Sequence, residues 1–475
     1  MSKLLRVSVG LTSAATLAFT LFAGPALAAP TPSPSETTSP SPLATPTANS
    51  SPSATASATP QPTPTRVPPT GPFAPCSAGK ALTSSSLGKL YGYVINADTG
   101  KVLIDIRGAE ATPSASVLKV LTASAAIVTL PTTYRAVTKV FSVPGQPGVL
   151  VLQGGGDHTL SRMTGDSYTT YYKPAKLETL AAQVFAKWSD SKPITKIILD
   201  SSFFSGPTYS PAWKLSDRTN GYISHITGIQ VDSDRANPDL TSTAYNGYRS
   251  TNPVLSAGKY FKAALDGLAE DAAVVEGKTP AGAVELTRVS SQPITNWLAH
   301  AIAVSDNTET EYIGRHAAKA AGLPPTFDSI QKLVSASLGP IGVDTTGLVM
   351  KDGSGLAQGD RVTAKMIAEL MVKVANNQSG LGALEGYLPV AGQTGTLAGR
   401  FNGSNAVAKR FVKGKSGFIP GLYSLAGIID AKDGSRLAYA LFARSADGKK
   451  VGYAARPALD TAATRFYQCG GGLTR

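Results

Sequence analysis

Residues 113–131 have the sequence PSASVLKVLTASAAIVTLP, and the interpretation of the whole chain begins there. Between the two prolines, apolar residues recur at helical spacing, at Val117, Leu118, Leu121, Ala125 and Val128. This pattern predicts a buried helix with Ser116 in its first turn, where free backbone N–H groups and the helix dipole favour developing negative charge. Lys119 follows three positions later on the same helix face, so the hydroxyl and the amine can share a proton.

A second motif, Ser305-Asp-Asn307, directly follows an apolar helical stripe that begins behind Pro293. Thr308 to Glu311 then open another helix. A short loop held between two helices is rigid, as a proton relay and an amide clamp require. The alternative is a segment that only caps a helix, since Ser, Asp and Asn are the favoured capping residues.

A third motif, Lys415-Ser-Gly417, lies in a region from Arg410 to Asp430 that is rich in Val, Phe, Ile, Leu and Tyr. A turn at Asp433-Gly434 and a second apolar run, Arg436 to Arg444, follow. We predict an antiparallel meander with this motif on its first strand and with Gly417 allowing close approach of a substrate backbone.

Each motif alone has little specificity. Ser-x-x-Lys also begins at Ser77, Ser86, Ser189, Ser256 and Ser329, and Ser-x-Asn also begins at Ser250. Lys-(Ser/Thr)-Gly occurs only at Lys415. The order of the three motifs, together with the helix around Ser116, is typical of serine enzymes that open D-alanyl peptides or β-lactams through an acyl-enzyme.

Further stretches carry a resemblance to a known family. They are Leu152-Gln-Gly-Gly-Gly-Asp157, Asp200-Ser-Ser-Phe203, Gly206-Pro207, Trp213, Asp352-Gly-Ser-Gly-Leu356, Arg361-Val-Thr363, Gly395-Thr-Leu397 and Arg400-Phe401. From about Leu90 to about Phe466 the chain resembles the low-molecular-mass penicillin-binding proteins of class C type, the branch with a long insertion. These act as D-alanyl-D-alanine carboxypeptidases and endopeptidases. His158 and Ser416 depart from the pattern, which often has proline and threonine there.

The resemblance implies a role for each motif residue. Ser116 would be the nucleophile, Lys119 its base and Ser305 the proton relay. The substrate-binding residues would be Asn307, Lys415, Ser416, Gly417 and Phe418, with the backbone N–H groups of Ser116 and Phe418 forming the oxyanion hole. The implied function is a serine carboxypeptidase, or endopeptidase, on peptidoglycan stem peptides, with β-lactams as inhibitors. A serine β-lactamase and a non-catalytic wall-binding protein are the alternatives.

The chain divides into four regions by composition and spacing. Residues 1–28 resemble a signal peptide that ends in Ala26-Leu-Ala28, although an uncleaved anchor is the alternative. Residues 29–75 are rich in Pro, Ser, Thr and Ala and predict a disordered linker. The chain between Ser116 and Ser305 is too long for a compact β-lactamase core, so we expect one or two smaller domains inserted at 137–286.

The remaining residues, 76–136 and 287–475, would form a discontinuous α+β catalytic domain of the β-lactamase/transpeptidase type. Its expected core is an antiparallel sheet flanked by helices. The hairpin Tyr91–Ile95 and Val102–Ile106 would join the C-terminal meander in one sheet. Inside the insertion, Pro144–Gln153 and Ile194–Asp200 are predicted strands, and Lys176–Trp188 is a predicted helix. A helix from about Pro457 to Gln468 would close the chain.

Composition also limits the partners. The chain has 2 cysteines, Cys76 and Cys469, which in an exported protein predict a disulfide, with two free thiols as the alternative. The net charge of +13 suits anionic wall polymers. Nucleic acid is disfavoured, because the basic residues are scattered and the chain is expected to be exported to the cell wall or secreted. The four histidines show no metal-ligand spacing, and no cofactor is expected.

Overall fold

The structure is a computed structural model that describes residues 67–69, 72–167, 170–188, 192–238, 247–446, 448 and 450–475. The predicted signal peptide and, apart from 67–69 and 72–75, the predicted linker lie outside these residues. Within the described ranges, no helix combines the length and the apolar character that crossing a membrane requires.

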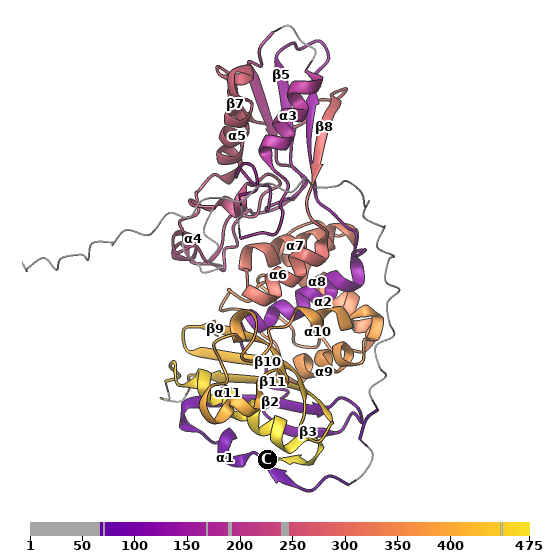
Figure 1. The fold of residues 1–475 in the computed structure, drawn as a ribbon, viewed down its shortest axis with the longest axis vertical. Coiled ribbons are helices and arrows are strands. Elements are labelled where there is room, and N and C mark those ends of the chain that lie inside the picture. Colours follow the sequence, from indigo (N-terminus) through magenta and orange to yellow (C-terminus); the bar gives the residue numbers. More distant parts are fainter. Residues whose placement is uncertain are drawn as a thin grey trace, which may run out of the picture. The chain divides into compact units, whose positions relative to one another are not determined.

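The larger sheet has five antiparallel strands in the order β3-β2-β11-β10-β9 (Figure 1). Their bounds are β2 Lys89–Asn96, β3 Val102–Ile106, β9 Val412–Ile419, β10 Leu422–Asp430 and β11 Arg436–Arg444. The hairpin near the start of the body therefore pairs with the C-terminal meander, as predicted. Strand β9, which carries Lys415-Ser-Gly417, lies at the edge of the sheet. Its first residues, Val412 and Gly414, bond Ala391 and Pro389 on the outer side, so the edge can meet a ligand only beyond them.

Helices cover both faces of this sheet. Side chains of successive strand residues point to opposite faces, so Leu441 packs into the core beneath helix α11 while Phe442 packs into the core shared with α2 and α9. The helices are α1 Gly79–Leu82, α2 Lys119–Thr129, α3 Leu177–Lys187, α4 Leu215–Thr219, α5 Pro253–Ala264, α6 Ile294–Val304, α7 Asn307–Ala320, α8 Phe327–Leu338, α9 Ala364–Ala375, α10 Gly382–Tyr387 and α11 Ala455–Cys469. Helices α2, α6, α7 and α8 pack together behind the sheet and carry two of the three motifs.

A second five-stranded sheet, in the order β7-β6-β5-β4-β8, lies in the predicted insertion. Its strands are β4 Val137–Ser142, β5 Val149–Gln153, β6 Lys196–Asp200, β7 Ala273–Glu276 and β8 Val284–Ser290. Helices α3 and α5 pack on it and close a core of its own. The insertion thus extends past residue 286 to the end of β8.

The first predicted strand of the insertion begins later than expected. We predicted Pro144–Gln153, but β5 starts at Val149 and the residues before it form a turn. Gly145 and Gly148 there have φ of 77° and 79°, a left-handed conformation that a strand does not allow and that glycine adopts at little cost. The adjoining strand β4 has no counterpart in the sequence-based prediction.

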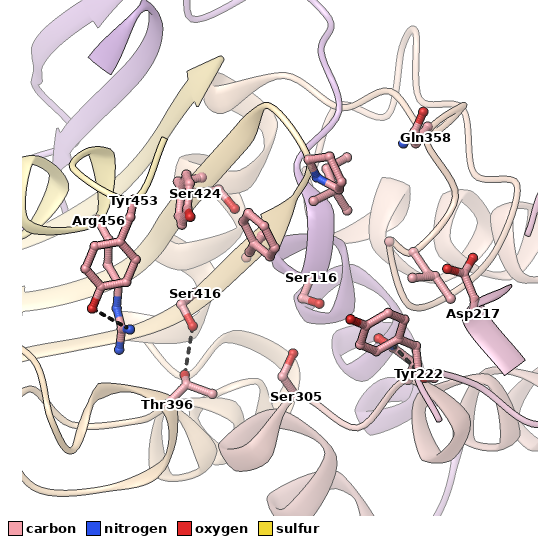
Figure 2. A pocket seen from close by; sticks show the side chains of 18 of the residues that line it. Ser116, Asp217, Tyr222, Ser305, Gln358, Thr396, Ser416, Ser424, Tyr453 and Arg456 are labelled. Carbon is pink, nitrogen blue, oxygen red and sulfur yellow. Dashed lines mark hydrogen bonds between the residues drawn. The ribbon is translucent and has the colours of Figure 1, made fainter. Parts of the chain in front are cut away.

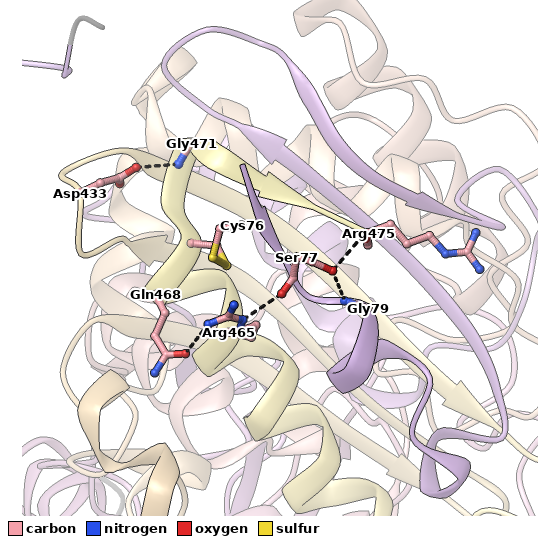
Figure 3. The surroundings of a disulfide bond; sticks show 9 residues. Cys76, Ser77, Gly79, Asp433, Arg465, Gln468, Gly471 and Arg475 are labelled. Atoms are coloured by element: carbon pink, nitrogen blue, oxygen red, sulfur yellow. Dashed lines mark hydrogen bonds between the residues drawn. A yellow bond between two sulfur atoms is a disulfide. The ribbon is translucent and has the colours of Figure 1, made fainter. Parts of the chain in front are cut away.

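The two ends of the described body meet at a disulfide between Cys76 and Cys469 (Figure 3). Beside it, the short strands β1 Cys76–Ser77 and β12 Leu473–Thr474 pair in parallel. Arg465 of α11 also donates a hydrogen bond to the carbonyl of Ser77. The bridge therefore reinforces termini that backbone pairing already holds together.

Candidate active site

Ser116 and Lys119 are held together at the start of the predicted helix. Residues Ala115–Leu118 form a 3-10 turn that continues directly into α2, so Lys119 is the first α-helical residue. The Lys119 side chain is fully buried, and its Nζ lies 3.0 Å from Ser116 Oγ. Ala115, just before the serine, has φ of 48°, a region that few non-glycine residues adopt. Ser424 Oγ fixes this turn by donating a hydrogen bond to the Ser114 carbonyl.

Burial brings the neutral form of the Lys119 amine closer to working pH. Besides Ser116 Oγ, its Nζ contacts Asn307 Oδ1 at 2.6 Å and the Ser354 carbonyl at 2.7 Å. Both of these groups can only accept hydrogen bonds, so a neutral amine donates to them and keeps its lone pair for the proton of Ser116. Burial lowers the pKa of Lys119 to about 8, although nearby carboxylates, first that of Asp352, act in the opposite direction.

Ser305 and Asn307 lie at the junction of α6 and α7, where Ser305 follows the end of α6 and Asn307 is the first residue of α7. Ser305 ends α6 with φ of 67°, and Asp306 caps α7 by accepting a hydrogen bond from the Glu309 N–H. We predicted that Asn307 holds the substrate amide. In the structure, its Oδ1 accepts from Lys119 and its Nδ2 donates to the Tyr222 carbonyl at 2.9 Å. Each end of the amide therefore has one partner within the protein. Nδ2 carries a second N–H and Asn307 also lines the pocket described below, so its contact with the substrate amide stays a prediction.

Lys415 lies on β9, opposite this turn. Its side chain is fully buried, and its Nζ donates to Ser305 Oγ and to the Ser416 carbonyl, each at 2.8 Å. Burial lowers the pKa of Lys415 well below its ordinary value, and the charge of Lys119 lowers it further. The next hydroxyl, that of Ser416, bonds Thr396 Oγ1 at 2.8 Å.

Gly417 brings the strand against the nucleophile. A Cβ at this position would lie 2.9 Å from the Ser116 amide nitrogen and 2.3 Å from Ser424 Oγ. Only glycine therefore fits beside the Ser116 N–H. The neighbouring Phe418 is 57% exposed, and its ring packs on Tyr423 with centroids 4.7 Å apart.

These groups open into one pocket of about 600 Å³ (Figure 2). It is lined by Ser116, Ser305, Asn307, Ser416, Gly417 and Phe418, together with residues from the insertion and from α11. In Figure 2, Ser116 lies above Ser305, and Tyr222 lies to the right of both. The structure thus brings together the three motifs predicted from sequence, with both lysines buried beneath the pocket.

Sequence reasoning missed two contributors to this site, the carboxylate of Asp352 and the backbone carbonyl of Ser354. The Asp352 carboxylate accepts backbone N–H groups from Ser354, Gly355 and Ala357, and so fixes the turn whose Ser354 carbonyl binds Lys119. Asp352 also accepts from Trp213 Nε1 of the insertion at 2.7 Å. The Asp352-Gly-Ser-Gly-Leu356 stretch was noted as a family signature, but no sequence signal placed its carbonyl on the lysine.

The histidines lie outside the pocket. His300 Nδ1 lies 2.5 Å from Glu309 Oε2, and His316 is fully buried against the Gly156 carbonyl. Among the described residues, His300, Asp306 and Glu309 form a group with spacing suited to a metal ion. Arg235 already pairs with Asp306 at 3.4 Å, so a cation there would meet a guanidinium.

The fold and this arrangement are those of a serine hydrolase that works through an acyl-enzyme. The chain belongs to the D-Ala-D-Ala carboxypeptidase 3 (S13) family, whose sequence model matches residues 78–251 and 242–466. The resemblance inferred from the motifs is thereby confirmed, and with it the carboxypeptidase class.

Relatives and solved structures agree with this membership. The chain is 34% identical over 395 residues to carboxypeptidase DacB of Mycolicibacterium smegmatis, covering 82% of this chain and 83% of that protein. It is 35% identical over 388 residues to carboxypeptidase Rv3627c of Mycobacterium tuberculosis, covering 81% of each. The fold is similar to the crystal structure of penicillin-binding protein 4 from Haemophilus influenzae, with a TM-score of 0.67, 20% identity, and 82% and 97% of the two chains covered.

Proposed function

We propose that this carboxypeptidase acts on peptidoglycan stem peptides outside the cytoplasm and that Ser116 is its nucleophile. The substrate would end in D-alanyl-D-alanine, and Ser116 would attack the carbonyl between the two residues. The observation that carries the proposal is the buried Lys119 amine, 3.0 Å from Ser116 Oγ. An alcohol is a weak nucleophile until an adjacent base takes its proton, and this amine is placed to do so.

The proton then has a route to the leaving group. Lys119 takes the proton of Ser116 as Oγ bonds to the carbonyl carbon, which forms a tetrahedral intermediate. Ser305 would protonate the departing amine, and Lys415, which donates to Ser305 Oγ, would replace that proton. D-Alanine leaves as the C–N bond breaks. Water then attacks the ester carbonyl, its hydroxyl joining the acyl group and its remaining proton returning to Ser116 Oγ. Lys119 releases its extra proton and Lys415 regains one through solvent, which restores the enzyme.

Two further parts of the site would bind the substrate, one its developing oxyanion and the other its terminal carboxylate. The Ser116 and Phe418 N–H groups would stabilise the oxyanion, since Gly417 holds β9 against the Ser116 amide. The terminal carboxylate would lie near Lys415 and Ser416. Its charge favours protonated Lys415 and so counteracts the lowering of the Lys415 pKa by burial.

The cellular setting and further ligands are part of the same proposal. An apolar segment ending in Ala26-Leu-Ala28 and the linker at 29–75 would export the enzyme and let it reach the cell wall. A net charge of +13 would hold it near anionic wall polymers. One solved structure of the Haemophilus influenzae protein is a complex with a β-lactam. We propose that β-lactams likewise acylate Ser116 here.

The test is covalent labelling followed by peptide mapping. Fluorescent penicillin should label Ser116 alone, and Ser116→Ala should remove both the label and the release of D-alanine from a D-alanyl-D-alanine peptide. Label on Ser256, which also begins a Ser-x-x-Lys stretch, would refute the assignment. Rapid turnover of the penicillin adduct would support a β-lactamase instead. Endopeptidase activity is measured separately, with a cross-linked peptide dimer as the substrate.

A further inference from the structure

The middle residue of the Ser305-Asp-Asn307 turn forms a buried ion pair with the inserted region. Arg235 NH2 lies 3.4 Å from Asp306 Oδ2, and the two side chains are 3% and 8% exposed. Tyr171, also from the insertion, donates to the same carboxylate oxygen at 3.3 Å. The insertion therefore contacts the catalytic turn directly.

The segment that presents Arg235 has an unusual backbone. Asp232, Ser233 and Asp234 have φ of 50°, 50° and 57°, three successive non-glycine residues in the left-handed region. Such residues persist only where surrounding contacts fix them, and they cluster at functional sites.

Several contacts hold this segment in place. The Ser233 N–H bonds the His158 carbonyl at 2.7 Å, and the Ser233 hydroxyl bonds Tyr171 at 2.6 Å. The Asp234 carboxylate accepts from the Ser250 N–H and from its hydroxyl. The conformation that directs Arg235 towards Asp306 is thus enforced from several sides.

Asp306 is placed where a small displacement affects both of its neighbours. It caps α7 through the Glu309 N–H, and the residue before it, Ser305, contacts Lys415. The residue after it, Asn307, contacts Lys119 at 2.6 Å. Movement of the Asp306 backbone would therefore disturb the hydrogen bonds of both lysines.

We propose that Arg235 is a positioning residue, which holds Asp306 so that Ser305 and Asn307 meet Lys415 and Lys119 in the reactive geometry. This gives the insertion a role in the reaction itself. The inference rests on the proposed roles of the three motifs, but it assigns Arg235 and Asp306 no contact with the substrate.

The charged groups around Asp306 come from the insertion and from helices α2, α6 and α7. Lys119 of α2 and Arg249 of the insertion both interact with it electrostatically. Arg235 and Tyr171 belong to the insertion, His300 to α6 and Glu309 to α7, and His158 lies beside Glu309 at 3.6 Å. Burial raises the pKa of Asp306, but Arg235 and then His300 more than offset this and lower it to about 2. Asp306 is therefore ionised at all working pH values. Without Arg235, its buried charge would lose its main partner.

The test uses the full-length enzyme with Arg235→Ala, Asp306→Asn and the double variant. Asparagine keeps the cap on α7 but removes the charge. For each single variant, kcat on a D-alanyl-D-alanine peptide and the acylation rate by penicillin should fall roughly 10- to 100-fold, the scale of a ~1 Å misplacement, while KM stays nearly constant. Because the two residues act through one contact, the double variant should be no worse than the poorer single variant.

The pH profile separates positioning from general loss of stability. The charge of Asp306 raises the pKa of Lys119. The midpoint of acylation against pH should therefore move down in Asp306→Asn and up in Arg235→Ala, where that charge is no longer offset. Arg235→Lys keeps a cation and should recover part of the kcat, and it replaces Arg235→Ala if the latter does not fold.

Tyr312→Phe is the matched control. Tyr312 lies on the same helix and bonds the insertion through the Thr227 carbonyl, at 2.9 Å, without contacting Asp306. The Tyr312→Phe substitution should lower the unfolding temperature but leave kcat unchanged. Normal kcat and midpoint in Arg235→Ala, with Ser116 still labelled, would overturn the positioning role while leaving the proposed function intact. If the losses of kcat in the two single variants add up in the double variant, the contact between Arg235 and Asp306 is not the cause of those losses.

Discussion

Lys415 Nζ donates a hydrogen bond of 2.8 Å to Ser305 Oγ, although the two residues are 110 positions apart in the chain. This bond joins edge strand β9 to the turn between α6 and α7. The lysine proposed to bind the substrate carboxylate and the serine proposed as proton relay are therefore joined by a hydrogen bond, and a change at either residue should affect both substrate binding and proton transfer.

Replacing Lys415 should reveal both effects. Charge-assisted hydrogen bonds contribute roughly 1.5–3 kcal/mol, so Lys415→Ala should slow acylation by penicillin about one to two orders of magnitude. Ser416→Thr should change little, because the hydroxyl bonded to Thr396 remains. The measurement compares the loss of activity from wild type to Lys415→Ala on a peptide that ends in a carboxylate and on the same peptide with a C-terminal amide. If the two lose activity equally, Lys415 acts through Ser305 and Lys119 and not by binding the carboxylate.

The pH dependence of acylation should follow Lys119. Only the neutral amine can accept the proton of Ser116, and burial lowers the pKa of Lys119 to about 8. The acylation rate should therefore rise with pH, reach half its maximum near pH 8 and then level off. Stopped-flow acylation with a chromogenic β-lactam gives the profile, and a rate independent of pH between 6 and 9 would contradict this role.

Lys119→Arg keeps the charge but should abolish acylation. A guanidinium cannot lose a proton in a protein, so it cannot serve as the base. Near-normal labelling of Ser116 in this variant would show that another group activates the serine. Circular dichroism of the same sample checks that the variant is folded.

Gly417→Ala should impair the site through crowding. The added Cβ would lie 2.9 Å from the Ser116 nitrogen and 2.8 Å from the Ser114 carbonyl, both backbone atoms. We expect a loss of about 1–3 kcal/mol in the free energy of unfolding and an acylation rate at least ~10-fold lower. Gly399→Ala is the control, since a Cβ there meets no atom within 4 Å. Equal acylation rates in the two variants would argue against the close approach of β9 to Ser116.

Removing the disulfide should lower stability without changing the reaction. Cys76 and Cys469 are 393 positions apart, so the loop-entropy model sets an upper limit on the order of 5 kcal/mol. Pairing of β1 with β12 should keep part of the arrangement in a Cys76→Ser/Cys469→Ser variant. Urea unfolding measures the first effect and kcat the second. A fall in kcat at temperatures where the variant is folded would link the bridge to the active site.

Much of this protein follows from local sequence. Apolar spacing between Pro113 and Pro131 is enough to predict α2, because a buried helix face requires apolar residues at that period. Turn residues between apolar runs likewise mark β10 and β11, and the order of the three motifs indicates the chemistry. Strand β4, which pairs with the distant β8 as well as with its neighbour β5, was missed because local propensity does not encode the distant partner. The turn before β5 was missed although Pro144-Gly145 and Pro147-Gly148 are turn signals in the sequence.

Tertiary structure alone decided which groups surround the two lysines. Lys119 meets the Ser354 carbonyl and Lys415 meets Ser305 only because the chain returns to one place from far along the sequence. Their lowered pKa values come from burial, which no motif expresses. The partners of Asn307, and the ion pair that joins Arg235 of the insertion to Asp306, were invisible in the sequence for the same reason. Motif residues are fixed by the chemistry they perform, whereas the groups that orient them can come from any segment that folding brings near.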